Sequence, residues 1–187
     1  MARKKEYIEA EVIEKAMNLF WQNGYETTSV RMLEKEMGIN QFSMYSSFGS
    51  KQGVFLESIK CYKEKLNGIL NKLKESPDGV NAIKQFFYDF LVFSRENKSK
   101  RGCLLVNTAT ELGENGDEQI LSEIWKFVEK RKAIFIEKLK LDSSKSEETI
   151  LKQVNYLLIA QQGLAVASKF YNQQQLEDFI ETTFEKL

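Results

Sequence analysis

The sequence predicts an all-α protein, and three observations support this prediction. Its 187 residues include one proline and 10 glycines, whereas Leu, Lys, Glu, Gln and Ile, which suit helices, recur throughout. Apolar residues return every three or four positions over long stretches, which is the period of one helix face. No stretch gives a credible strand or a tandem repeat, so we expect about nine helices.

The first two helices are predicted from apolar spacing and from the residues at their ends. Residues 6–23 have helical spacing, and Gly24 tolerates the left-handed conformation that often ends a helix. Thr27 or Thr28 suits the N-cap of a second helix, and Gly38 would end that helix.

A third, short helix follows a turn that contains Gly38. Asn40 can cap this helix, which would run to about Ser47. Two short helices joined by a glycine-containing turn define a helix-turn-helix. Three apolar residues would hold the third helix against the first two, namely Ile39, Met44 and Phe48.

The opposite side of the third helix carries no negative charge. It combines aromatic rings with hydrogen-bonding groups, on Gln41, Phe42, Ser43, Tyr45 and Ser46. Such a face suits the wall of a DNA major groove. The alternative is that this short helix is a connector whose aromatic residues belong to the core.

The rest of the chain predicts six further helices, most of them longer. Their expected ranges are 51–75, 80–97, 102–112, 120–141, 149–170 and 176–187. We therefore divide the chain into a helix-turn-helix domain, residues 1–50, and a larger helical domain, residues 51–187.

The sequence lacks the residues that several classes of enzyme and metal site require. The chain has no histidine, which excludes Ser-His-Asp triads and histidine-containing zinc sites, and it has no phosphate-binding glycine motif. We expect no enzyme, no cofactor and no metal. Cys61 and Cys103 are far apart and are interpreted as buried thiols. Apolar runs fall short of the roughly 18 residues of a membrane helix, and no secretory signal is evident, so we expect no membrane and a cytoplasmic protein.

The segment Leu19–Phe55, LFWQNGYETTSVRMLEKEMGINQFSMYSSFGSKQGVF, resembles the N-terminal domain of TetR/AcrR-type transcriptional regulators. The shared features are the LF…GY…T(S/T)V pattern, the glycine of the turn and the M-Y-x-x-F-x-S-K ending. Gly102–Leu112, GCLLVNTATEL, also looks like the start of the sixth helix in a subset of this family. The resemblance implies DNA binding by residues 1–50, with ligand binding and dimerisation by residues 51–187.

The resemblance also implies roles for individual residues. Thr28 would present its hydroxyl to a phosphate at the start of the second helix, and Lys51 would reach another phosphate. Gln41, Phe42 and Ser43 would face base edges, and Tyr45 would contact a phosphate or a thymine methyl group. The full set of expected DNA contacts is Thr28, Ser29, Arg31, Gln41, Phe42, Ser43, Tyr45, Ser46 and Lys51.

This sequence departs from the family pattern at two positions in the third helix. Phe42 stands where a small residue is frequent, which suggests apolar contact with thymine methyl groups. Ser47 stands where His or Tyr is frequent, which removes one phosphate contact.

The balance of charge counts against strong phosphate binding. The net charge is zero, and residues 1–51 hold seven Lys or Arg against seven Glu. We expect Arg3, Lys4 and Lys5 to form a basic arm, while Arg31 and Lys51 flank the third helix. With so few cations, the affinity for DNA should depend only weakly on salt.

Candidate pocket residues are aromatic side chains and polar residues that interrupt apolar helices. They are Tyr62, Phe86, Phe90, Asn107, Thr110, Glu111, Trp125 and Gln161. A cavity with few polar groups is the usual site of a small molecule. The alternatives are that the aromatic residues are ordinary core and that Glu111 pairs with an Arg or Lys.

The last two predicted helices contain the materials of a symmetric interface between two subunits. Small and apolar residues alternate there, and the expected contacts are Leu157, Leu164, Ala167, Phe179 and Phe184. The alternative is packing within one chain. A dimer would place two reading helices on a palindromic operator.

The expected function is a homodimeric repressor that binds double-stranded DNA and is released by an unidentified small apolar or amphipathic ligand. The helix that begins at Lys51 would transmit the change. One alternative is a regulator controlled by a protein partner without such a ligand. A more remote one is a helical enzyme or lipid-carrier domain.

Overall fold

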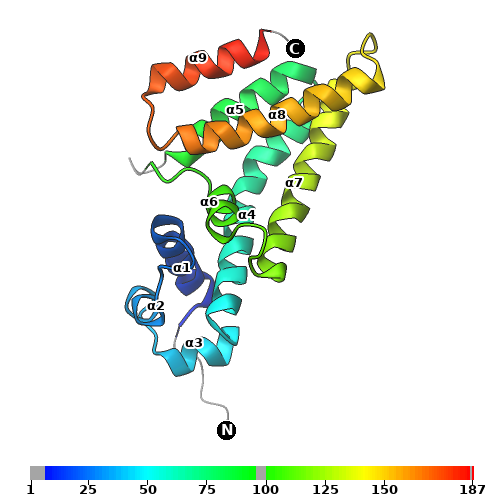
Figure 1. The fold of residues 1–187 in the computed structure, drawn as a ribbon. Helices are drawn as coiled ribbons and strands as arrows, with labels where there is room; N and C mark the ends of the chain where they lie inside the picture. The colour runs from blue at the N-terminus through cyan, green and yellow to red at the C-terminus, as the bar shows by residue number, and fades with distance from the viewer. Residues whose placement is uncertain (1–6, 96–99, 186) are drawn as a thin grey trace.

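The computed structural model describes residues 7–95, 100–185 and 187, and this part of the chain forms nine helices and no strand. The all-α prediction is therefore confirmed (Figure 1). The helices are α1 (Glu9–Asn23), α2 (Val30–Met37), α3 (Gln41–Phe48), α4 (Lys51–Glu75), α5 (Gly79–Ser94), α6 (Leu104–Leu112), α7 (Glu118–Leu139), α8 (Glu147–Ala167) and α9 (Gln173–Phe184). Across the described ranges, no helix is long and apolar enough to cross a membrane. The expected basic arm, Arg3, Lys4 and Lys5, lies outside the described residues.

The helices α1, α2 and α3 gather at one end of the molecule, and α5, α8 and α9 lie at the other end (Figure 1). The helix α4 is 25 residues long and connects the two groups, because it packs against α1 and α3 as well as α5 and α7. The short helix α6 lies between the groups and contacts α1, α4, α7 and α8.

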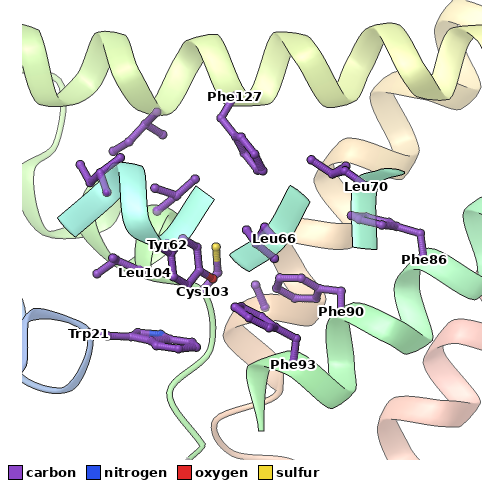
Figure 2. Packing of buried hydrophobic residues seen from close by; sticks show 14 of the residues in the cluster. Trp21, Tyr62, Leu66, Leu70, Phe86, Phe90, Phe93, Cys103, Leu104 and Phe127 are labelled. Carbon is purple, nitrogen blue, oxygen red and sulfur yellow. The ribbon is translucent and has the colours of Figure 1, made fainter. Parts of the chain in front are cut away.

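Both groups contribute to one hydrophobic core. Phe55 of α4 packs edge-on against Phe20 of α1, with ring centroids 4.7 Å apart. Further along α4, Tyr62 meets Trp21 of α1 at 5.0 Å and Phe93 of α5 at 5.5 Å (Figure 2). The proposed boundary after residue 50 therefore separates two groups of helices that share buried side chains.

The helix ends follow the sequence signals, with one correction. Gly24 and Gly38 have φ angles of 87° and 73°, as expected of residues that end helices. Asn40 caps α3, because its Oδ1 accepts the backbone N–H of Ser43 at 2.8 Å. The expected N-cap of α2, Thr27 or Thr28, is wrong: Ser29 is the cap and accepts from the backbone N–H of Met32.

The inner face of α3 holds this helix on α4 and α2. Met44 is fully buried, and Ile39 and Phe48 are half-buried against the same core. On the next turn, the Tyr7 hydroxyl donates to the Ser43 carbonyl oxygen at 3.1 Å and lies 2.7 Å from Ser47 Oγ. These contacts fix which side of α3 faces outwards.

Two neighbouring positions on α3 test this orientation. Met44→Ala should lower the free energy of unfolding by about 2–5 kcal/mol, because it leaves a cavity in the core. Phe42→Ala should change that free energy by about 0.5 kcal/mol or less, because the ring is exposed. Urea unfolding followed by circular dichroism measures both, and equal losses would contradict the orientation.

Candidate functional site

The outer face of α3 presents the predicted DNA-contacting residues to solvent. Gln41 and Ser46 are exposed, and Phe42 keeps 85% of its surface exposed. Ser43 and Tyr45 are half-buried. Gln41, Phe42, Tyr45 and Ser46 line a shallow surface hollow. An exposed helix face of this composition can enter a groove of a nucleic acid.

The expected role of Thr28 needs correction. Its side chain is fully buried, and its hydroxyl donates to the Gly24 carbonyl oxygen at 2.6 Å. The hydroxyl is therefore engaged within the turn that precedes α2. Ser29 and Arg31, which follow closely in the chain, are exposed, and Ser29 also caps α2.

Lys51 lies at the start of α4 and is half-buried. Its ammonium group donates to the Glu26 carbonyl oxygen at 3.3 Å and stands 4.6 Å from the centre of the Tyr25 ring. A phosphate that Lys51 contacts would thus meet an ammonium group already positioned beside the loop between α1 and α2.

A cavity of about 460 Å³ opens between α6 and α7. Most of its lining is apolar, and α8 contributes one residue. The lining residues are Cys103, Leu105, Val106, Ala109, Thr110, Gly113, Glu114, Leu121, Ile124, Trp125, Phe127, Val128, Arg131 and Gln162. Two of the predicted pocket residues, Thr110 and Trp125, are among them.

The other predicted aromatic residues belong to the core and do not line this cavity. Tyr62, Phe86 and Phe90 are buried among α4, α5 and α7, and Figure 2 shows their rings within the packed interior. Phe86, for example, packs edge-on against Phe135 with ring centroids 5.7 Å apart. Periodicity marks these rings as buried but cannot distinguish a core face from a cavity wall.

The predicted polar residues also have other surroundings. Asn107 donates through Nδ2 to the Arg101 carbonyl oxygen at 2.9 Å, and it lies in a different hollow, beside Trp21. Gln161 is fully buried, and neither amide atom has a hydrogen-bond partner among the described residues. Neither residue lines the cavity between α6 and α7.

Sequence reasoning missed Arg131, which is 5% exposed and lines the cavity. The signal was present, because Arg131 follows Ile120, Ile124 and Phe127 at helical spacing on the buried side of α7. A cation in an apolar stripe marks a buried charge. Burial lowers the pKa of its guanidinium group.

Glu111 has a structural partner that neither sequence-based alternative foresaw. Its carboxylate accepts the backbone N–H groups of Tyr25 at 2.8 Å and Glu26 at 2.9 Å. The residue is exposed, no Arg or Lys pairs with it in the described part of the chain, and it does not line the cavity. Glu111 instead ties α6 to the loop between α1 and α2.

Comparison with known proteins identifies the group of helices that carries α3. Residues 12–58 match the family model described as bacterial regulatory proteins, tetR family. This part of the chain is a tetR-family domain. The matched range covers most of α1, all of α2 and α3, and the start of α4.

Two relatives place the chain among TetR-type regulators. The HTH-type transcriptional regulator YezE of Bacillus subtilis is 33% identical over 112 residues, which are 59% of this chain and 58% of YezE. The biofilm operon icaADBC negative transcriptional regulator IcaR of Staphylococcus aureus is 28% identical over 137 residues, 73% of each chain. Both relatives are named as regulators, in agreement with the expectation that the chain is not an enzyme.

Solved structures show that the whole fold is of the TetR type. The regulator CifR, in complex with 26-bp double-strand operator DNA, superposes with a TM-score of 0.87 at 22% identity over 98% of each chain. A TetR regulator from Legionella pneumophila gives 0.83 at 16% identity over 99% of this chain and 100% of that one. At these identities the likeness shows the fold alone.

An apolar stripe runs along the outer face of α8 in this TetR-type fold. Tyr156, Ile159 and Val166 leave 48%, 70% and 44% of their surfaces exposed, and Phe170 just beyond the helix leaves 72%. These four residues follow one another at helical spacing on one side. Phe179 of α9 is also exposed, at 40%.

Most of the expected interface residues do not belong to this stripe. Leu157 and Leu164 are fully buried within the chain, and Phe184 is buried against Phe87 with ring centroids 5.1 Å apart. Ala167 is half-buried, and Phe179 alone of the five is exposed. Leu157 and Leu164 lie on the opposite side of α8, where their burial stabilises the monomer.

The two cysteines lie at different depths. Cys103 is buried, whereas Cys61 is half-buried, and both thiols are free. The expectation of buried thiols is thus confirmed for Cys103 only.

Proposed function

We propose that the chain is a DNA-binding transcriptional repressor that acts as a homodimer on a palindromic operator and is released by a small molecule. The observation that carries the proposal is the exposed face of α3, presented by a helix-turn-helix in the range that matches the tetR family. The name of IcaR as a negative regulator supports repression. Such a repressor acts in the cytoplasm, where bacterial DNA lies.

The reading roles follow from chemistry and exposure. Gln41 has the carboxamide that can bind adenine through two hydrogen bonds, and Phe42 offers an apolar surface to thymine methyl groups. Ser29, Arg31 and Lys51 contact phosphates on either side of α3, and these contacts position the helix without reading sequence.

The apolar stripe of Tyr156, Ile159, Val166 and Phe170 supplies the dimer interface, together with Phe179. Exposed apolar side chains that follow one another on one helix mark an interaction surface. A symmetric interface buries the same stripe on both subunits and presents two α3 helices to DNA.

The Glu111 contact gives a route from the cavity to the reading helices. Val106, Ala109 and Thr110 of α6 line the cavity, and the next residue holds the loop between α1 and α2. A ligand that displaces α6 therefore moves this loop, on which Lys51 also rests. The helix α4 moves with it, since it packs on α1 and α6. The coupling must act equally in both directions.

The proposal is tested by selecting duplexes from a random library with the purified chain. We expect enrichment of a palindrome with half-sites about one helical turn apart, or a multiple of that spacing. Failure to enrich any duplex would refute DNA reading by α3.

Substitutions of Gln41 and Lys51 should distinguish base contacts from phosphate contacts. On the enriched duplex, Gln41→Ala should cost about 1–3 kcal/mol and relax preference at one position of each half-site. Lys51→Ala should weaken all duplexes alike and reduce the salt slope by about 1. Fluorescence anisotropy at several salt concentrations measures both, and a changed base preference in Lys51→Ala would contradict the assignment.

A charge in the stripe should separate the subunits. Ile159→Glu would bury a carboxylate in the interface and should give a monomer by size-exclusion chromatography with light scattering. Val92→Glu is the matched control, because Val92 is 69% exposed on α5, against 70% for Ile159, and should leave the dimer intact. A dimer that persists in Ile159→Glu would place the interface elsewhere.

Removal of the Glu111 carboxylate should loosen the loop and weaken DNA binding. In Glu111→Ala the amides of Tyr25 and Glu26 should exchange hydrogen faster, because they lose their acceptor. The affinity for the enriched duplex should fall, because α3 is no longer held in a fixed position by this loop. Glu118→Ala, which removes an exposed carboxylate from α7, is the control. Faster exchange with unchanged affinity would show that this loop does not position α3.

A further inference from the structure

The cavity between α6 and α7 contains a buried positive charge without a counter-charge. Arg131 is 5% exposed, and its Nε is buried with no hydrogen-bond partner in the described part of the chain. No acidic side chain lies within ion-pair distance of Arg131 among those same residues. Burying an unpaired charge costs several kcal/mol, so buried charges in proteins are normally paired.

The other buried cation of α7 shows the usual solution. Lys138 is 7% exposed, and its ammonium group donates to the backbone carbonyl oxygens of Lys74, at 2.9 Å, and Ser76. These acceptors lie where α4 ends, so the charge of Lys138 is satisfied by the fold itself. Arg131, two turns away on the same side of the helix, has no such acceptors.

Neither the phenol nor the one carboxylate near Arg131 neutralises its guanidinium group. Tyr62 and Cys103 face the guanidinium group, and burial raises the pKa of the Tyr62 phenol well above its usual value. The phenol is therefore neutral near neutral pH, whereas an arginine remains protonated. Glu114 supplies the one carboxylate of the described lining, but it is exposed and forms no ion pair with Arg131.

The remaining lining determines what kind of molecule can bring the missing charge. Leu105, Val106, Ile124, Phe127 and Val128 surround the cavity with apolar surface. A guanidinium group matches a carboxylate through two parallel hydrogen bonds. One cation among apolar walls suits a single negative charge on an apolar body, because a dianion would leave one charge unpaired.

We propose that this cavity binds an organic monocarboxylate, whose carboxylate pairs with the Arg131 guanidinium group while its apolar body contacts the walls of α6 and α7. This assignment rests on the proposed function, because it specifies the chemical class of the releasing ligand. It narrows the expected apolar or amphipathic molecule to an anion.

Matched probes test the charge preference directly. Isothermal calorimetry with decanoate and decanol, which share a chain and differ in charge, measures both affinities on the full-length dimer. We expect decanoate to bind at least tenfold more tightly than decanol. Equal affinities, or no binding of decanoate, would overturn the proposal.

Arg131→Met removes the charge of the side chain and leaves a smaller, unbranched apolar one. In this variant the affinity for decanoate should fall at least tenfold and the affinity for decanol should change little. Lys130→Met is the control, because the exposed neighbouring Lys130 bonds to Asn67 of α4 and does not line the cavity. Unchanged decanoate binding in Arg131→Met would refute the pairing.

Thermal unfolding without ligand distinguishes a binding role from a structural one. Arg131→Met should melt at the same temperature as the wild-type chain or higher, because it removes an unpaired buried charge. A melting temperature that falls by several degrees, with the preference for decanoate intact in the folded variant, would show that Arg131 serves the fold.

The enriched duplex separates this proposal from the proposed function. If decanoate binds through Arg131 but leaves the affinity for DNA unchanged, the carboxylate site stands and release by ligand fails. If the chain reads its palindrome but decanoate does not bind, the carboxylate site fails and DNA reading stands.

Discussion

The packing of α4 against both groups of helices is the constraint on which the rest of the structure depends. Phe55 meets Phe20 and Tyr25 at one end of this packing, and Tyr62 meets Trp21 and Phe93 further along. Because these rings are close-packed, the group of α1, α2 and α3 cannot shift relative to α4 without a rearrangement of shared core side chains. The same contacts bring α6 and the loop between α1 and α2 within reach of each other.

The Glu111 carboxylate contributes only two hydrogen bonds, far fewer contacts than the core, but these two bonds connect different parts of the fold. The bonds join α6, which lines the cavity, to the loop between α1 and α2. Gly24 begins this loop. A Cβ atom at Gly24 would lie 2.8 Å from Glu111 Oε1, and the backbone there has a φ of 87°. Glycine thus permits both the turn and the close approach of the carboxylate.

Two features of the larger group of helices are incomplete in a single chain without ligand. The stripe of Tyr156, Ile159, Val166 and Phe170 exposes apolar surface, and Arg131 holds a charge that the described residues do not balance. Each carries a free-energy cost that association can relieve, by burial of apolar area in one case and by pairing of charge in the other. A second subunit and an anionic ligand are the complements that we propose for these features.

The sequence alone determined the helices, the caps at Asn40 and Gly38, and the outward face of α3, because these depend on local spacing and backbone preference. The tertiary structure decided the partners. Burial of Thr28, the role of Glu111 and the depth of Phe86 depend on residues far away along the chain. Likewise, apolar spacing placed Leu157 and Leu164 in an interface, and only the packing of α5, α6 and α7 showed that they face inwards while Ile159 remains exposed.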